Sequence, residues 1–307
     1  MSDIKLFRLM NGSASEMHGL ASDLEKPLQT LIERNLEALL GVRFLSTEYS
    51  TGKTHSGRID TLGLDENNCP VILEYKRSAG ENVINQGLFY LDWLMDHKAE
   101  FQLLALNHVG KESADKIDWS SPRLICVAAD FTKYDAHAVQ QIDRNIELIR
   151  YRQFGNELLL LELVNSTSGK SVGSNKGGAL KSPKSKAVSK STTLYGAEAL
   201  TSAKPETREL FESLEGYIMS LGDDVQRKDL KLYIAFKRIR NFTTVEVYKD
   251  KLLLHVHLNP DDVELEKGFT RDVRNKGHWG TGDLEVWVRN RVDLERTKPL
   301  IKRAHEG

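Results

Sequence analysis

The sequence predicts an α/β protein with two domains, on the basis of three observations. Helical and strand-like apolar patterns alternate through residues 1–165, which is typical of a mixed sheet flanked by helices. The segment from Ser166 to Thr193 is rich in serine, glycine and lysine and almost lacks large apolar side chains, which predicts a linker. Residues 194–307 place one helix before four strand-like runs, which predicts a smaller α+β accessory domain.

The composition is that of a globular protein and indicates no membrane partner. Of the 307 residues, 40% are hydrophobic and 28% are charged, and no run of about eighteen apolar residues occurs. The N-terminal region lacks the apolar segment and small-residue cleavage site of a secretory signal, so we expect a cytoplasmic protein. Cys69 and Cys126 lie in apolar strand-like runs, which favours buried thiols over a disulfide or a zinc site.

Charge is distributed unevenly along the chain. Residues 1–165 hold 17 Lys and Arg against 24 Asp and Glu, a balance of -7, whereas residues 166–193 hold six lysines and no acid. The linker is therefore either a solvated spacer or a basic strap that contacts phosphates.

In the first domain, regularly spaced leucines and an isoleucine predict a helix from about Pro27 to Leu40 that ends at Gly41. Strand-like runs follow at 42–50, 58–65 and 70–78, and the polar letters between the last two predict a hairpin. A helix is expected after Gly80. Further strand-like runs are FQLLALN, RLICVAA, IELIRYR and ELLLLELV.

In the second domain, apolar spacing predicts an amphipathic helix from Leu210 to Leu221. The strand-like runs KLYIAFKRI, TTVEVYKD, KLLLHVHL and DLEVWVRN follow, and a helix from about Leu294 to Lys302 closes the chain. A nearby group of basic and aromatic residues could clamp nucleic acid or simply cover the core; it comprises Arg271, Arg274, Lys276, His278, Trp279, Trp287 and Arg289.

The predicted hairpin brings two acids together. If its turn is centred on Asn67, Asp60 lies opposite Glu74, with Cβ atoms about 5 Å apart. Two carboxylates at that distance repel each other, so a positive charge is needed between or beside them. Lys76, two residues beyond Glu74 on the same strand face, supplies one such charge.

This arrangement suits metal-assisted phosphodiester hydrolysis. Carboxylate oxygens hold Mg²⁺ or Mn²⁺, and Lys76 would orient the attacking water and stabilise developing negative charge. The alternative is an exposed cross-strand salt-bridge cluster that contributes about 0 to 1 kcal/mol to stability.

The run GRID ending at Asp60, followed after thirteen residues by EYK at 74–76, resembles the PD-(D/E)xK nuclease superfamily without its proline. Gln86 and Tyr90, four residues apart on one helical face, resemble the QxxxY element of its RecB-like branch. The pattern is most similar to the nuclease domain of NucS-type endonucleases. This resemblance implies a restriction-endonuclease-like sheet, a Mg²⁺ or Mn²⁺ cofactor, and DNA cleavage in repair or defence.

The resemblance also implies a further carboxylate from the first helix, for which Glu25, Glu33 and Glu37 compete. Glu33 lies nearer the buried stripe than Glu37 does, and the direction of Glu25 cannot be projected because Pro27 favours a helix start after it. We therefore assign Glu33 to the catalytic set, with Asp60, Glu74, Lys76 and Gln86.

Basic residues flank the predicted site and would contact the phosphate backbone together with Tyr90; these are Lys53, His55, Arg58 and Arg77. The leading hypothesis is a metal-dependent DNA endonuclease. RNA as a substrate and a homodimer as the assembly stay open, as do two other functions, an inactive nucleic-acid-binding module and a protein-interaction adaptor. The second half of the chain resembles an uncharacterised family of C-terminal domains, which supplies no chemistry.

Overall fold

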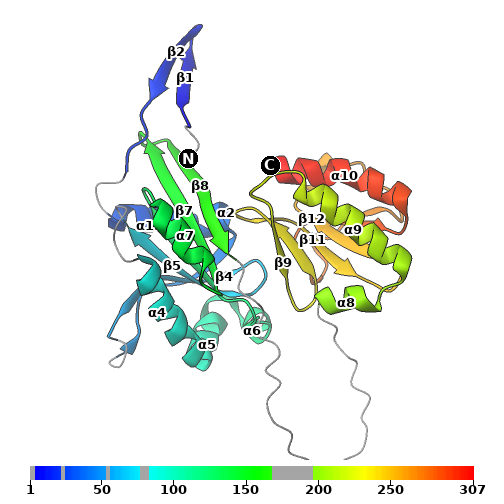
Figure 1. The fold of residues 1–307 in the computed structure, drawn as a ribbon, viewed down its shortest axis with the longest axis horizontal. Coiled ribbons are helices and arrows are strands. Elements are labelled where there is room, and N and C mark those ends of the chain that lie inside the picture. The colour runs from blue at the N-terminus through cyan, green and yellow to red at the C-terminus, as the bar shows by residue number, and fades with distance from the viewer. Residues whose placement is uncertain (1–3, 22–24, 53–55, 77–82, 168–195) are drawn as a thin grey trace, which may run out of the picture. The chain divides into compact units, whose positions relative to one another are not determined.

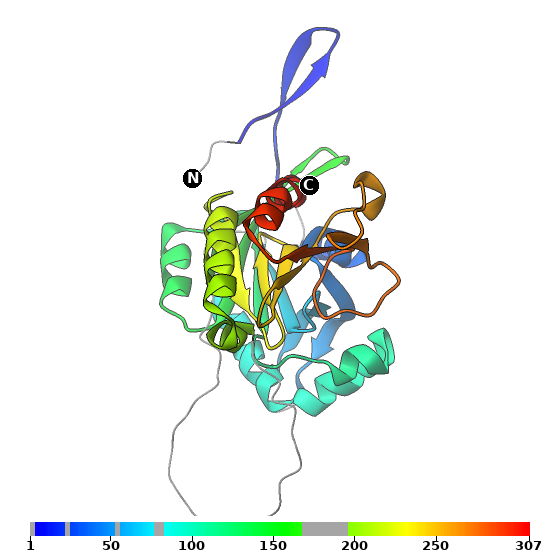
Figure 2. The same cartoon turned by 90° about the vertical axis from the view of Figure 1, so that its right-hand side faces the viewer.

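A computed structural model describes residues 4–21, 25–52, 56–76, 83–167 and 196–307 (Figures 1 and 2). The chain divides into two compact units, Met1–Lys170 and Ser171–Gly307. Most of the predicted linker, residues 168–193, lies outside the described residues. Within the described part of the chain, no helix combines the length and apolar character needed to cross a membrane.

The first unit contains a two-stranded hairpin, a six-stranded mixed sheet and helices. In sheet order, the six strands are β3 (Val42–Ser50), β4 (Arg58–Asp65), β5 (Pro70–Lys76), β6 (Arg123–Ala128), β7 (Asn145–Phe154) and β8 (Leu158–Thr167). Strands β5, β6 and β7 run parallel to one another, and the remaining neighbours are antiparallel. The helices are α1 (Glu25–Arg34), α2 (Leu36–Leu40), α4 (Val83–Asp96), α5 (Lys98–Val109), α6 (Lys111–Asp115) and α7 (Lys133–Gln140).

Helices cover both faces of this sheet. Leu62, Ile72 and Leu124 belong to one apolar core with the buried residues of α4 and α5. Thr61, which alternates with Leu62 along β4, meets α1 instead, where its hydroxyl donates a hydrogen bond to Glu33 at 2.6 Å. The predicted α/β fold with a mixed sheet between helices is confirmed.

The β4–β5 hairpin has the predicted register. Thr61 pairs with Leu73, and all paired residues have numbers that sum to 134. The turn is fastened by the buried Asp65, whose Oδ1 accepts hydrogen bonds from the N–H groups of Asn67 at 2.9 Å and Cys69 at 2.8 Å. A carboxylate that binds amides two and four residues ahead is a common device for closing a tight turn.

The strand expected at FQLLALN is a helix, α5. Phe101 and Ala105, four residues apart, are both buried against the core, whereas Leu103 is 58% and Leu106 is 42% exposed. A short apolar run fits either element, and here the helical spacing of the two buried residues decided the outcome.

Two boundaries and one further element also differ from those expected. The first helix is interrupted at Asn35, whose side chain donates to the backbone oxygen of Leu31, and α2 then ends at Gly41 with φ 63°, as its glycine predicts. Ser166 and Thr167 end β8 rather than start the linker, because they still pair with β7. The sequence patterns did not indicate the N-terminal hairpin of β1 (Leu6–Met10) and β2 (Ser13–Met17), which projects at the top of Figure 1.

The second unit is a six-stranded antiparallel sheet with helices, as predicted for an α+β domain. Its strand order is β13 (Thr270–Asp272), β14 (Leu284–Val288), β12 (Leu252–Val256), β11 (Asn241–Val247), β10 (Ile234–Lys237) and β9 (Gln226–Asp229). Buried side chains of α9 (Pro205–Met219) and α10 (Arg291–Glu306) share one apolar core with the sheet. Helix α8 (Gly196–Ser202) and the short 3-10 helix η1 (Pro260–Asp262) complete the unit.

Candidate functional site

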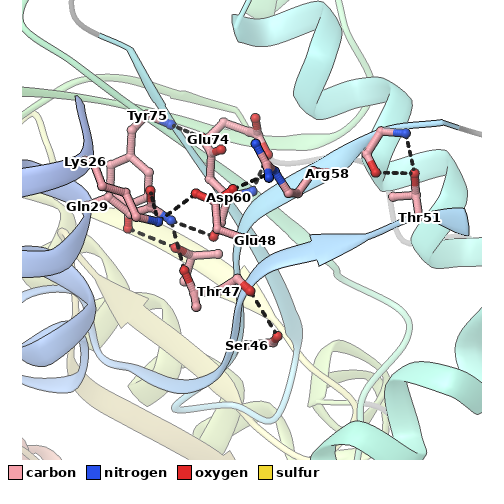
Figure 3. Close-up of polar contacts among 12 residues, drawn as sticks. Lys26, Gln29, Ser46, Thr47, Glu48, Thr51, Arg58, Asp60, Glu74 and Tyr75 are labelled. Atoms are coloured by element: carbon pink, nitrogen blue, oxygen red, sulfur yellow. Dashed lines mark hydrogen bonds and ion pairs between the residues drawn. The ribbon is translucent and has the colours of Figure 1, made fainter. Parts of the chain in front are cut away.

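The two strands of the β4–β5 hairpin are joined by carboxylates at their open end. Beyond the pair Thr61 and Leu73, the N–H of Asp60 donates to Glu74 Oε1 at 3.2 Å. The N–H of Tyr75 donates in turn to Asp60 Oδ2 at 3.0 Å. Each acid is therefore tethered to the opposite strand, and the predicted juxtaposition of Asp60 and Glu74 is present in the structure (Figure 3).

Within this acid pair, Glu74 is buried and Asp60 is partly buried. Glu74 is 0% exposed, and its Oε2 has no hydrogen-bond partner among the described residues. Burial raises the pKa of Glu74 to about 9, and the neighbouring charge of Asp60 acts in the same direction. Burial also raises the pKa of Asp60, although the N–H of Tyr75 and the ammonium of Lys76 counteract it. The pair therefore attracts a proton or a cation.

Lys76 ends β5, where sequence reasoning placed it beside the pair. Its positive charge lowers the pKa of both Asp60 and Glu74, so the three predicted residues form one electrostatic group. Among the residues that the structure describes, no three His, Cys, Asp or Glu side chains form a cluster that could hold a metal ion. The site therefore offers two acidic side chains, with one lysine beside them.

Glu48 is a third acid near the pair that the sequence pattern did not reveal. It lies within β3, and its negative charge raises the pKa of both Asp60 and Glu74. Its carboxylate accepts from Lys26 at 2.7 Å and forms an ion pair with Arg58 at 2.6 Å. Glu48 has φ 51°, a left-handed conformation that costs a non-glycine residue about 1–3 kcal/mol and is concentrated at functional sites.

Glu33, the helix acid chosen from the sequence, contacts the site indirectly. Its Oε1 accepts hydrogen bonds from Thr61 at 2.6 Å and from Gln29 at 2.9 Å. The side-chain amide of Gln29 also donates to the backbone oxygen of Asp60 at 2.8 Å. Glu33 thus supports β4, the strand that carries Asp60, through its hydrogen bonds with Thr61 of β4 and Gln29 of α1.

Glu25 acts on the pair more directly, because its charge raises the pKa of Asp60. Helix α1 begins at Glu25, two residues before Pro27, so the proline does not mark the helix start assumed in the sequence projection. Glu37, the third candidate, is exposed on α2 and acts on Arg43 instead, where its charge opposes the lowering of the pKa by burial.

A hollow of about 680 Å³ adjoins Asp60. The side-chain amide of Gln86 donates to the hydroxyl of Tyr90 at 3.3 Å, as expected for residues on one face of α4. The same hydroxyl accepts the N–H of Arg58 at 3.1 Å, although Tyr90 as a whole is only 5% exposed. The hollow is lined by Ser50, Gly52, Ser56, Gly57, Arg58, Asp60, Gln86 and Tyr90.

Gly57 and Thr51 shape one wall of this hollow. A Cβ on Gly57 would lie 2.6 Å from Cε1 of Tyr90, so the close approach of strand and ring requires glycine. The N–H of Gly57 donates to the hydroxyl of the buried Thr51 at 2.9 Å. Arg58 is exposed beside this wall, whereas the predicted backbone contacts Lys53 and Arg77, with His55, lie outside the described residues.

The fold and the tethered acids define an α/β protein with a carboxylate pair, one member of it fully buried, at the open end of a hairpin inside the sheet. The chain is 31% identical over 305 residues to an uncharacterized protein of Haemophilus influenzae, across 98% of this chain and 99% of that protein. It belongs to the family of that protein. Residues 197–307 also match the family model of a domain of unknown function, DUF5655, as the resemblance of the C-terminal half implied.

Two solved structures show partial similarity to the chain. A repair endonuclease from Pyrococcus abyssi matches with 21% identity and a TM-score of 0.28, over 42% of this chain and 49% of that one. EndoMS, solved in a complex with double-stranded DNA, matches with 21% identity and a TM-score of 0.24, over 43% of this chain and 47% of that one. This chain therefore spans about half the length of each.

Proposed function

We propose that this protein is a Mg²⁺- or Mn²⁺-dependent DNA endonuclease whose site is built on Asp60, Glu74 and Lys76. One observation carries the proposal: the hairpin places two acids against each other in a buried setting and leaves Glu74 Oε2 without a described partner. Burying two like charges is unfavourable unless a proton or a cation neutralises them.

The residues fit a hard divalent cation. Mg²⁺ in proteins usually keeps several waters and is held by one or two carboxylates, which matches a site with two acids. Asp60 and Glu74 would hold the ion, and Glu74 Oε2 is the buried oxygen that lacks a described donor. When bound, such an ion lowers the pKa of a coordinated water and offsets negative charge on the phosphate.

The remaining residues have separate tasks in this proposal. The ammonium of Lys76 beside the pair stabilises negative charge on the scissile phosphate and orients the attacking water. The hydroxyl of Tyr90, held by Gln86, fixes the backbone of Arg58 at the wall of the hollow. The hollow beside Asp60 is open to solvent and could admit a DNA backbone.

Cleavage assays test the proposal. Branched, mismatched, single-stranded and plain duplex DNA are incubated with the full chain, with Mn²⁺, with Mg²⁺ or with EDTA. We expect metal-dependent products from at least one substrate, and a rate roughly 10³-fold lower for Asp60→Asn and for Glu74→Gln.

Asp92→Asn is the matched control, because it removes an exposed carboxylate from α4 of the same unit. It is expected to cleave at the wild-type rate. Products that form equally well in EDTA, or activity retained by both Asp60→Asn and Glu74→Gln, would overturn the assignment.

A further inference from the structure

The second unit contains a basic cleft that the proposed nuclease site does not use. It has a volume of about 530 Å³ and lies where β13, β14 and the turn before β12 meet. Its lining includes four cationic side chains and one indole, contributed by Lys251, Lys267, Arg271, Arg289 and Trp287. We call this the basic cleft.

Two of these cations, Lys251 and Lys267, are not paired with an acidic side chain: within the described part of the chain, neither forms an ion pair with a carboxylate. Arg271 pairs with Glu285 at 2.6 Å and Arg289 pairs with Asp293 at 3.1 Å. Arg289 also donates to the backbone oxygen of Gly268. A guanidinium carries five N–H donors in a fixed fork, so these partners exhaust neither arginine.

Trp287 is held in a fixed orientation within the cleft. Its indole N–H donates to Glu285 Oε1 at 2.8 Å, which anchors one edge of the ring. The ammonium of Lys251 lies over the ring, 4.2 Å from its centroid. A cation on the ring is a weak, reversible contact. An anion that binds Lys251 could draw the ammonium aside and leave the indole available to a flat ligand.

Other residues of the same basic and aromatic group are engaged within the domain. Arg274 is clamped between Asp261 at 2.8 Å and Asp272 at 2.7 Å. The ring of His278 stacks on the buried His255 with centroids 4.4 Å apart. Arg274 and His278 are therefore already engaged, whereas the basic cleft gathers four cations around one indole.

We propose that the basic cleft binds a nucleotide unit, with phosphate held by Lys251 and Lys267 and the base stacked on Trp287. The clustered cations select a phosphate, and the anchored indole selects an aromatic ring. The mouth of the cleft is open at Gly268, where an added Cβ would meet nothing within 4 Å. A nucleic-acid strand and a free nucleotide share this chemistry. The proposal is independent of the acid pair in the first unit.

Binding is measured by fluorescence anisotropy of a short labelled oligothymidylate with the full chain in EDTA, so that no metal-dependent cleavage occurs. The test variant is Lys251→Gln with Lys267→Gln. Its matched control is Lys231→Gln with Lys302→Gln, which removes the same charge from exposed positions outside the cleft. Losing two phosphate contacts should reduce the salt dependence, the slope of log K against log salt, by about 1.4.

Trp287→Phe supplies a second measurement. Tryptophan fluorescence should be quenched when thymidine monophosphate or the oligonucleotide binds the wild type, and this change should be absent in Trp287→Phe. Competition distinguishes the two sources of the ligand. Displacement by the monophosphate at equal nucleotide concentration indicates a free nucleotide, and displacement by the oligonucleotide alone indicates a strand.

Three results would overturn the proposal: neither probe binds the wild type, the test variant keeps the affinity and salt slope of its control, or quenching persists in Trp287→Phe. Asp92→Asn, which removes an exposed carboxylate of the first unit outside both proposed sites, should bind as the wild type does. Binding is measured in EDTA, so it does not require a working acid pair. Failure of cleavage and failure of this site are therefore separate results.

Discussion

Acidic side chains are buried at both ends of the β4–β5 hairpin, but only those at the turn end are paired with a buried cation. At the turn end, Asp65 and Glu147 share the buried Arg123, which donates to Asp65 Oδ2 at 2.9 Å and to both oxygens of Glu147 at 2.9 and 2.8 Å. At the open end, Asp60 and Glu74 face each other, and Glu74 Oε2 has no described partner.

The electrostatic balance separates the two groups. Burial alone would lower the pKa of Arg123, but the charges and hydrogen bonds of Glu147 and Asp65 hold it above its ordinary value. At the open end burial raises the pKa of Glu74, and a like charge raises it further. The turn end is thus a completed ion network that supports the fold, whereas the open end retains a capacity for binding a cation.

The largest expected effect on stability comes from breaking the completed network. Arg123→Met leaves two buried acids without their cation, so the free energy of unfolding should fall by about 3–5 kcal/mol. Urea denaturation followed by circular dichroism measures this change. The control Arg8→Met removes an exposed ion pair with Glu157 and should cost less than about 1 kcal/mol. Equal losses in the two variants would contradict the distinction between the two ends.

At the open end, we expect a substitution to raise the free energy of unfolding instead of lowering it. In EDTA, Glu74→Gln should stabilise the protein at pH 8 by more than about 1.4 kcal/mol, the equivalent of one pKa unit. The folded chain holds a proton on Glu74 up to about pH 9, whereas the unfolded chain releases it near 4.5. The wild type therefore loses stability as pH rises through this window, and the neutral variant does not.

Measuring the stability difference between Glu74→Gln and the wild type at several pH values checks this prediction. The advantage of Glu74→Gln should vanish near pH 4.5, where Glu74 is protonated in both states, and should grow steadily toward pH 9. Urea denaturation at several pH values measures the difference. A variant that is less stable than the wild type at pH 8 would show that the ionised acid contributes to folding.

The smallest effect is expected at the wall of the hollow. Tyr90→Phe removes the hydroxyl that accepts from the Arg58 N–H and from Gln86, so it should cost about 1 kcal/mol of stability. The control Tyr134→Phe changes a tyrosine that is 72% exposed and should leave stability unaltered. Equal stability of Tyr90→Phe and the wild type would show that this hydroxyl does not stabilise the wall of the hollow.

The acid pair could be predicted from sequence because its geometry is local. The side chains of a strand alternate with a period of two, and the polar turn fixed which residues face each other. The register that places Asp60 against Glu74 therefore followed from counting residues across Asn67. The shared face of Gln86 and Tyr90 followed in the same way from helical spacing.

The rest of the site depends on tertiary placement and on backbone conformations that no pattern marks. Glu48 approaches the pair because β3 packs beside β4, and its positive φ is not encoded by a glycine. Glu25 was not chosen because the true start of α1 lies before Pro27. The close approach of Gly57, the residue before β4, to the ring of Tyr90 on α4 depends on how the helix packs, which residue spacing does not report.

The turn held by Asp65 has a consequence for how the family can vary. The same carboxylate accepts hydrogen bonds from two amides of the turn through one oxygen and from Arg123 through the other, so these contacts fix the length of the turn. One residue inserted before Cys69 would move the pairing by one position and bring Leu73 opposite Asp60, with Glu74 turned to the other surface. Relatives that retain the acid pair should therefore tolerate insertions elsewhere before they tolerate one here.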